Sequence, residues 1–234
     1  MKRLNLLGKG MTALTLLFSV TACDDDVMEP ENARVLVVHA SPDAPGVDLL
    51  VDNNKINSTA LVYPNNTGYL SIAEGNHNIK VNATATSTSV INADVNLVKD
   101  MNYTVFAYDM VSAIKPLVLM DNLATPANGK AHIRFMHLSP GAPAVTVGVV
   151  NGRAFTPLFS NRTFETAATA TANQAFMPVD AGTYTVEVRV AGTDNAVLTV
   201  PNVALQSGKI YTVFARGIVG NATSPLGPTV IMHN

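Results

Sequence analysis

The sequence predicts an all-β protein with two tandem β-sandwich domains. Four sequence blocks recur in the same order along the chain, and apolar residues alternate with polar ones over short segments. No segment sustains the 3.6-residue period of an amphipathic helix. Regularly spaced short strands with turn signals between them are typical of a β-sandwich, so the repeat predicts one sandwich in each copy.

The internal repeat sets the expected domain boundaries. Its blocks, given as first and second copy, are 33–45 and 131–143, 69–75 and 176–182, 103–107 and 211–215, and 116–122 and 228–234. The third block, Tyr-Thr-Val-Phe-Ala, returns unchanged. We therefore expect a first domain at 33–123, a linker at 124–130 and a second domain at 131–234.

Each copy is expected to hold about seven short strands. In the first copy they fall near 34–39, 47–52, 68–73, 77–83, 90–97, 103–109 and 116–121. Val47, Leu49 and Val51 occupy alternate positions in the second of these strands, so they share one face. The Asn151-Gly152 pair of the second copy is a hairpin signal.

Two tyrosines sharpen the sandwich prediction. Tyr211 follows Gly208 by three residues, and Tyr103 follows Asp100 by the same spacing. This pattern resembles the tyrosine corner of immunoglobulin-like sandwiches, in which the hydroxyl bonds to the upstream backbone. We interpret both tyrosines as structural and expect two tandem immunoglobulin-like β-sandwich domains.

Residues 1–22 have the pattern of a lipoprotein signal peptide. Lys2, Arg3 and Lys9 precede an uncharged, mostly apolar segment at 10–22. This segment is too short for a bilayer-spanning helix, which needs about 20 residues. Small residues lead into Cys23, the only cysteine, which resembles the lipobox of bacterial lipoproteins. That resemblance implies cleavage before Cys23 and acylation of this residue, which would attach the protein to the membrane.

Residues 23–32 are interpreted as an acidic tether. Asp24, Asp25 and Asp26 follow the cysteine directly. This run resembles the surface-export signal of lipoproteins in the Bacteroidetes, and a plain solvated tether is the alternative. We expect an outer-membrane lipoprotein of a bacterial envelope, with the periplasmic and outer faces both left open.

Composition excludes several classes of function. The chain has 15 Lys and Arg against 17 Asp and Glu, a net charge of −2. Loss of the three positive charges of the signal leaves 12 against 17, or −5. Neither balance provides the basic stripe that nucleic-acid binding needs. A single cysteine forms no internal disulfide and no multi-cysteine zinc site, and we expect no cofactor and no metal.

The first repeat block also carries a family resemblance. A strand that ends in His-Ala-Ser-Pro-Asp-Ala-Pro at 39–45, followed later by Tyr-Thr-Val-Phe-Ala, resembles the bacterial domain-of-unknown-function 4397 family. The resemblance covers nearly all of residues 33–234 and implies an envelope lipoprotein with tandem β-sandwich modules. The second copy departs from the pattern at Gly141. The family supplies no catalytic residues to carry over.

The histidines and aspartates of the repeats are not expected to form a site. His39 and His137 end the first strand of each copy, where a histidine is expected to bond to loop carbonyls rather than to a metal. Asp43, Asp48 and Asp52 carry the oxygen ligands that calcium prefers. However, Asp48 and Asp52 lie roughly 13 Å apart along one strand, which is too far for one ion.

The largest difference between the copies is a segment that is nine residues longer in the second copy (107 − 98 = 9). It holds Arg153, Phe155, Phe159, Arg162 and Phe164, followed by a Thr/Ala run at 166–172. We expect a loop here, whose exposed aromatic rings would stack on sugars or anchor a partner. The alternative is that the phenylalanines fill core or interdomain positions.

These observations predict a membrane-anchored, non-catalytic binding module for a surface glycan or an envelope protein. The alternative is a structural or assembly component of a cell-surface complex, in which strand edges contact a partner. A secreted-type hydrolase is less favoured, because the copies share no acid–base constellation.

Overall fold

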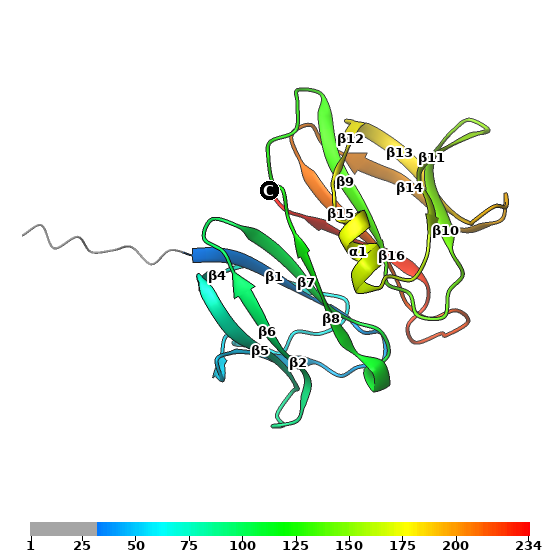
Figure 1. Cartoon of the computed structure of the whole chain (residues 1–234). Coiled ribbons are helices and arrows are strands. Elements are labelled where there is room, and N and C mark those ends of the chain that lie inside the picture. Colours follow the sequence, from blue (N-terminus) through cyan, green and yellow to red (C-terminus); the bar gives the residue numbers. More distant parts are fainter. Residues whose placement is uncertain (1–31) are drawn as a thin grey trace, which may run out of the picture.

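A computed structural model of the protein describes residues 32–234 (Figure 1). The N-terminal half contains β1 (Asn32–Ala40), β2 (Val47–Val51), β3 (Asn54–Lys55), β4 (Asn66–Ala73), β5 (Gly75–Ala83), β6 (Ser89–Leu97), β7 (Asn102–Tyr108), the 3-10 helix η1 (Val111–Ala113) and β8 (Lys115–Met120). The C-terminal half contains β9 (Lys130–His137), β10 (Val145–Asn151), β11 (Ala154–Arg162), α1 (Ala167–Asn173), β12 (Met177–Asp180), β13 (Gly182–Val190), β14 (Ala196–Leu205), β15 (Ile210–Arg216) and β16 (Gly227–Met232).

The strands form four sheets, and every sheet draws its strands from one half of the chain. The N-terminal half has an inner sheet of order β4-β1-β7-β8 and an outer sheet of order β3-β2-β5-β6. The C-terminal half has an inner sheet of order β12-β9-β15-β16 and an outer sheet of order β11-β10-β13-β14. In each inner sheet the first strand of the half pairs in parallel with the strand of the Tyr-Thr-Val-Phe-Ala block. The predicted all-β sandwich class is confirmed.

Three apolar layers lie between the four sheets, in the order outer N, inner N, inner C and outer C. Alternation along β1 shows how this arises: Val35 and Val37 enter the core between the two N-terminal sheets. Leu36 and Val38 point the other way, into a core that also contains Met136 and other residues of the inner C sheet. A third core fills the space between the two C-terminal sheets. Strands buried on both faces carry near-continuous apolar runs, which explains the run from Val35 to Val38 in β1.

Turn chemistry fixes the hairpins of both halves. Asp52 and Asn53 adopt φ values of 50° and 68° between β2 and β3. Gly152, in the corresponding turn of the C-terminal half, has a φ of 61°. Two-residue hairpins favour this left-handed region, which Asn, Asp and Gly enter at low cost.

The expected loop of the longer second-copy segment is wrong. Residues 154–162 form strand β11, and the Thr/Ala run forms helix α1, where no helix was predicted. Thr166 caps this helix by accepting from the backbone N–H of Thr169. Ala170 anchors it in the core between the inner sheets. A seven-residue helix is too short to show a period and is stabilised by packing rather than by propensity.

The expectations for residues 1–31 lie outside the described residues. They comprise the signal peptide, acylation at Cys23 and the Asp24 to Asp26 run. Within residues 32–234, neither helix has the length and apolar content to cross a membrane.

Candidate functional site

The two repeat histidines hold the loops that follow their strands. His39 Nε2 lies 2.9 Å from the Pro45 carbonyl oxygen, and His137 Nε2 lies 3.0 Å from that of Pro143. Both side chains are buried, and burial lowers the pKa of each imidazole. A neutral ring donating to a loop carbonyl is the structural role that the sequence suggests.

The two repeat tyrosines also bond to upstream backbone. The Val98 N–H donates to the Tyr103 hydroxyl at 3.3 Å, and the Gln206 N–H donates to the Tyr211 hydroxyl at 3.2 Å. Each bond spans five residues, as in a tyrosine corner. Both rings are buried in the sandwich cores, where they connect the turn to the strand that follows.

The five residues expected to bind a ligand do not form one exposed surface. Phe159 is buried and stacks on Phe135 in the core of the C-terminal half, with 6.0 Å between ring centres. Phe164 packs 5.5 Å from the Tyr108 ring, at the core between the inner sheets. Both therefore occupy core and interdomain positions. Phe159 is buried and Phe164 is half-buried against a different core, so the two rings do not form one exposed platform for a sugar.

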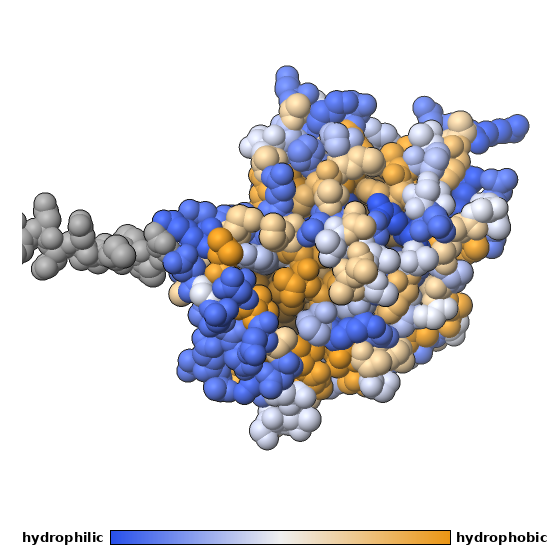
Figure 2. All heavy atoms as spheres, in the orientation of Figure 1, coloured by the Kyte–Doolittle hydropathy of each residue, from blue (hydrophilic) through white to orange (hydrophobic). Residues whose placement is uncertain are grey.

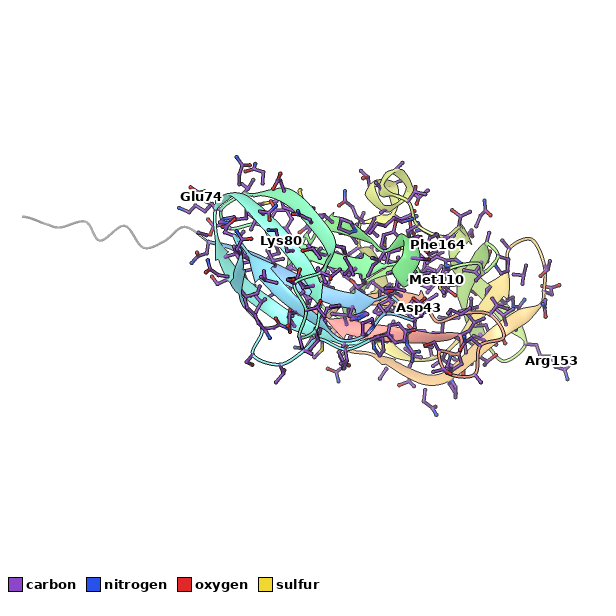
Figure 3. All side chains as sticks on the ribbon, turned by 90° about the horizontal axis from the view of Figure 1, so that it is seen from below. Asp43, Glu74, Lys80, Met110, Arg153 and Phe164 are labelled. Carbon is purple, nitrogen blue, oxygen red and sulfur yellow. The ribbon has the colours of Figure 1, made fainter. Side chains whose placement is uncertain are left out.

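The remaining members of that set are also dispersed. The Arg189 guanidinium carbon lies 3.9 Å from the centre of the Phe155 ring, which is covered on that face. Arg162 lies over Phe159, 5.3 Å from its ring centre. Figure 3 shows Arg153 projecting from one end of the molecule, far from Phe164.

The aspartates considered for calcium are engaged separately. Asp48 pairs with Lys55 at 2.8 Å, and Asp52 lies 2.7 Å from His77. Asp43 accepts from the Val111 N–H at 2.7 Å. Among the residues that the structure describes, no three His, Cys, Asp or Glu side chains gather into a group that could hold a metal.

A buried polar cluster joins the inner sheets of the two halves. Arg134 on β9 approaches Asp121, the residue after β8, with Nη2 2.6 Å from Oδ1 and both side chains fully buried. This contact is an ion pair rather than an aligned hydrogen bond, because Oδ1 has no hydrogen-bond partner. Asp121 Oδ2 accepts from Thr104 at 2.7 Å and from the Tyr69 hydroxyl at 2.6 Å.

His233 completes the cluster from the C-terminal end of the chain. Its Nδ1 lies 2.8 Å from the Tyr69 hydroxyl, and its Nε2 lies 2.7 Å from Thr212 Oγ1. The single Tyr69 proton goes to Asp121, so His233 Nδ1 donates to Tyr69 and Nε2 accepts from Thr212. Burial lowers the pKa of His233 to about 4. Burial also raises the pKa of Tyr69 above its usual range, and the Asp121 charge adds to this.

This cluster is a structural joint between the halves. Arg134 also donates from Nε to Thr212 at 2.8 Å and lies over the Phe176 ring, 4.5 Å from its centre. Because the carboxylate and the guanidinium are fully shielded from solvent, the ion pair offers no open position for a reacting molecule. The contacts instead fix how the inner sheets face each other.

An apolar cavity of about 240 Å³ lies between the two sheets of the C-terminal half. Its walls are the inward faces of β9, β15 and β16 in the inner sheet and of β10, β13 and β14 in the outer sheet. Figure 1 shows these two sheets on opposite sides of the C-terminal half. Its walls are almost entirely apolar and include Ile133, Phe135, Val147, Val186, Val188 and Val213. An engineered apolar cavity of about 150 Å³ stays dry and accepts small apolar ligands, so this larger cavity has the properties of a ligand site.

The N-terminal half shows why the cavity exists, because its equivalent space is only about 20 Å³. Where that half has Leu49 and Ile79, the C-terminal half has Val147 and Val186, each smaller by one methylene. Ile114, after η1, also packs against the first core.

The sheet edges differ as well. The edge strands β6 and β8 contact each other and close the N-terminal sandwich. Within residues 32–234, β14 and β16 make no comparable contact. The C-terminal sandwich therefore lacks the closure that its counterpart has along this edge.

The cavity has an apolar rim. Val197, Val219 and Val230 line the cavity and are 41%, 53% and 51% exposed, so their side chains reach solvent. They come from β14, the loop after β15, and β16, so the rim lies between the two edge strands. Exposed valines here continue the apolar wall outward, which lets an apolar molecule pass without meeting a polar barrier.

Three polar residues line the loop end of the cavity. His137 is bonded to Pro143, Ser139 donates to the Gly217 carbonyl at 2.6 Å, and Arg216 Nε donates to Thr229 Oγ1 at 2.8 Å. His137 and Ser139 do not have to be paired by a ligand.

Sequence reasoning did not find the cavity. The signal was present in the aligned copies, as the Leu49/Val147 and Ile79/Val186 differences on inward-facing positions. Differences of one methylene do not alter the apolar pattern of a strand, so the pattern alone does not mark these positions.

The N-terminal half of the chain resembles a known protein family. Residues 33–148 match the family model described as Domain of unknown function (DUF4397). This match covers the N-terminal half, β9 and the beginning of β10. No curated protein matches the chain.

Several solved structures resemble the chain weakly. A family 26 carbohydrate-binding module from Eubacterium rectale, solved with maltoheptaose, is 10% identical with a TM-score of 0.27, covering 85% of this chain and 96% of its own. A protein described as a cell adhesion protein from Parabacteroides distasonis is 9% identical with a TM-score of 0.22, over 86% and 97%. An adhesin-like protein from Bacteroides ovatus is 10% identical with a TM-score of 0.22, over 86% and 92%. At these values the likeness carries no argument about function.

Proposed function

We propose that this protein is a non-catalytic binding module, anchored to a bacterial envelope through Cys23, that takes an apolar ligand between the sheets of its C-terminal half. The observation that carries the proposal is the 240 Å³ apolar cavity with an apolar rim. Burial of apolar ligand surface is favourable by about 25 cal/mol per Å², so no polar contact inside the cavity is needed.

The two halves have different roles in this proposal. We attribute the recurring blocks to a duplication that gave two sandwich copies, of which only the second keeps a ligand-sized cavity. The first copy is well filled and is joined to the second through the core between the inner sheets. It would serve as the rigid support that holds the binding half away from the membrane.

The anchor is proposed from the lipobox-like sequence before Cys23. We expect a Cys23→Ala variant to lose acyl-chain labelling and to leave the membrane fraction of the cell. Labelling that persists in this variant would refute the anchor. Protease treatment of intact cells would then separate surface exposure from a periplasmic location in the outer membrane.

A surface glycan is a second candidate ligand, and a different surface favours it. The outward face of the outer N sheet carries a row of amide and carboxylate side chains. Asn78 Nδ2 donates to Asn92 Oδ1 at 2.9 Å and to Asp94 Oδ1 at 2.8 Å, and the flanking Asn76 and Asn96 are exposed. Carboxamides both donate and accept, which suits sugar hydroxyls. Retention on a glycan array that is lost in an Asn76→Ala/Asn96→Ala variant would support this candidate.

Partner binding through strand edges stays a prediction. Figure 2 shows apolar surface in the region of β8, where Val118 and Met120 are 42% and 50% exposed. Recovery of one stoichiometric envelope protein from a pull-down, insensitive to changes in the cavity and on the amide face, would favour the assembly alternative.

The apolar-ligand proposal is tested with the fluorophore 1-N-phenylnaphthylamine, which brightens in apolar surroundings. We expect saturable binding by the protein without its signal peptide. Val230→Asp places a charge at the rim and should weaken binding at least tenfold. Val118→Asp is the matched control, because Val118 is the equivalent position of the first copy and lines no described cavity. Equal binding by both variants and the parent would refute the site.

A further inference from the structure

We propose that the natural occupant of the C-terminal cavity is one linear acyl chain, inserted tail first through the β14/β16 edge. This inference rests on the proposed function and specifies its ligand class. It is carried by three features of the cavity: its elongated shape, its almost entirely apolar lining, and a rim that reaches the loop end but not the Ile133 end.

The cavity is elongated along the strands. On the inner sheet its wall runs from Ile133 through Phe135 and His137 to Ser139. Six residue steps in a strand correspond to roughly 20 Å. Packed sheets lie only about 10 Å apart, so the space is a slot rather than a round chamber. A slot of this form suits a flexible chain better than a fused ring system.

The lining chemistry excludes a ligand whose buried part is polar. The wall side chains are almost entirely aliphatic or aromatic. Of the polar side chains at the loop end, His137 and Ser139 bond to the backbone at Pro143 and Gly217, and Arg216 Nε donates to Thr229 Oγ1 at 2.8 Å. A hydroxyl, amide or carboxylate placed in the slot would lose its bonds to water without replacement, which is unfavourable. The buried portion must therefore be hydrocarbon.

The strand register places the rim along the β14/β16 edge, from the loop end of the slot to the level of Phe135. Val230 pairs with Val213, and Val213 pairs with Phe135, so Val230 lies two residues from Ile133 and four from Ser139 along the slot. Val197 follows Ala196, which pairs with Arg189 near the loop end. The opposite end is closed by Ile133 and Leu205, both buried. A chain whose polar group stays at the loop end, where Val197 reaches solvent, points its methyl end at Ile133 and Leu205 and leaves its polar group in water.

The same chemistry is available as a free fatty acid or as one chain of a phospholipid. In both cases the recognised part is the hydrocarbon chain, and the polar group stays outside the rim. Membrane attachment of the protein does not decide between these sources, so the experiment includes both.

The test is a chain-length series in competition with bound 1-N-phenylnaphthylamine. Straight-chain fatty acids of increasing length are added, each below its micelle concentration. Each methylene buried contributes about 0.8 kcal/mol, so affinity should rise about fourfold per added carbon. The rise should stop when the chain fills the slot. Phosphatidylcholine vesicles form the second arm and compete only if a membrane lipid can supply the chain.

A variant at the closed end shows where the chain lies. Ile133→Phe adds bulk next to Leu205, so the plateau should move to shorter chains by two or more carbons. Retention of the parent melting temperature by this variant shows that it is folded. Val118→Asp, at the equivalent rim position of the first copy, should leave the whole series unchanged.

The outcomes separate the two proposals. If fatty acids compete with a rise and a plateau, the acyl-chain proposal holds. If only a compact ring compound such as adamantane displaces the fluorophore, the apolar-ligand function stands and the acyl-chain proposal is overturned. If the fluorophore itself does not bind, both proposals fall. A plateau that does not move in folded Ile133→Phe also overturns the proposed tail-first orientation.

Discussion

Arg134 of the C-terminal half and Asp121 of the N-terminal half form a fully buried ion pair, with 2.6 Å between Nη2 and Oδ1. The repeat places Arg134 where the first copy has Leu36, a buried residue in the same core. The duplicated interface is therefore asymmetric: one copy supplies hydrocarbon and the other a charge. We expect this pair to set the relative position of the halves, because Arg134 reaches Asp121 only when the two inner sheets face each other in this one arrangement.

Removing one partner should be far more damaging than removing the charge pair. Arg134→Met leaves the Asp121 carboxylate buried without its counter-charge, and we expect a loss of about 3–5 kcal/mol of unfolding free energy. The measurement is urea unfolding at pH 7. Arg134→Met combined with Asp121→Leu should recover most of the loss, since a buried ion pair is often replaceable by hydrocarbon. A single variant as stable as the parent would contradict the pairing.

Stability should fall in mild acid because of His233. Burial lowers the pKa of its imidazole from 6.5 to about 4 in the folded state. Between these pH values the imidazole is protonated in the unfolded chain and neutral in the folded chain. The free energy of unfolding therefore decreases as the pH falls. Stability is then fully present above pH 6.5 and is lost toward pH 4, by up to about 3 kcal/mol.

The buried His39 and His137 shift in the same direction, so a control must isolate His233. In His233→Gln the pH dependence between 4 and 6.5 should become shallower, while the contribution of the other two histidines persists. The direct measurement is NMR titration of the imidazole. A His233 that titrates near 6.5 in the folded protein would show that the cluster is open to water.

The sequence was sufficient for the strands and their faces. Period-two alternation, as in Val47, Leu49 and Val51, located strands within two residues of their ends in the first copy. In β1 the core residues Val35 and Val37 alternate with Leu36 and Val38, which are equally apolar because this strand is buried on both faces. What covers the second face depends on how the copies pack, and local alternation carries no information about that contact.

The site was less predictable for the same reason. An arginine within the apolar run of β9 marks a buried charge, but its partner Asp121 belongs to the other half. Phe159 and Phe164 lie in a segment that is polar on average, so their burial follows from packing partners far away in sequence. The size of a cavity depends on the space between two packed sheets and on the side-chain volume that fills it. The pattern of apolar residues in a sequence gives neither quantity.

The tyrosine corners should contribute separately to stability. Tyr103→Phe and Tyr211→Phe each remove one acceptor from a backbone N–H, and we expect a loss of about 1 kcal/mol for each. The bonds lie in different sandwiches, so the double variant should lose the sum within about 0.5 kcal/mol. Chemical denaturation measures all three. Markedly unequal losses of unfolding free energy in the two single variants would mean that one of the two corner hydrogen bonds does not form in solution.

Gly148 is required by the close approach of β11. A methyl group at this position would lie 2.4 Å from the Thr156 carbonyl oxygen and 2.6 Å from the Phe155 ring. Gly148→Ala should therefore push β11 from β10 and lose about 1–3 kcal/mol. Gly182→Ala is the control, because its methyl group would lie 3.4 Å from the movable Tyr184 ring. Equal melting temperatures for the two variants would contradict the strand pairing.

Giving the second copy the core residues of the first should raise its stability and weaken its binding of an apolar ligand. Val147→Leu and Val186→Ile restore the methylenes found at Leu49 and Ile79. We expect the double variant to gain about 0.5–2 kcal/mol, as cavity-filling changes commonly do. Its affinity for 1-N-phenylnaphthylamine should fall, because the same volume is no longer open to the ligand.

The reverse change in the first copy provides the control. Leu49→Val and Ile79→Val should destabilise the N-terminal half by about 1 kcal/mol or more in total, as methylene deletions in a filled core do. The affinity of the C-terminal cavity for the fluorophore should not change. A second-copy variant that is both less stable and unchanged in binding would show that Val147 and Val186 face a filled core, and the apolar-ligand proposal would then fail with it.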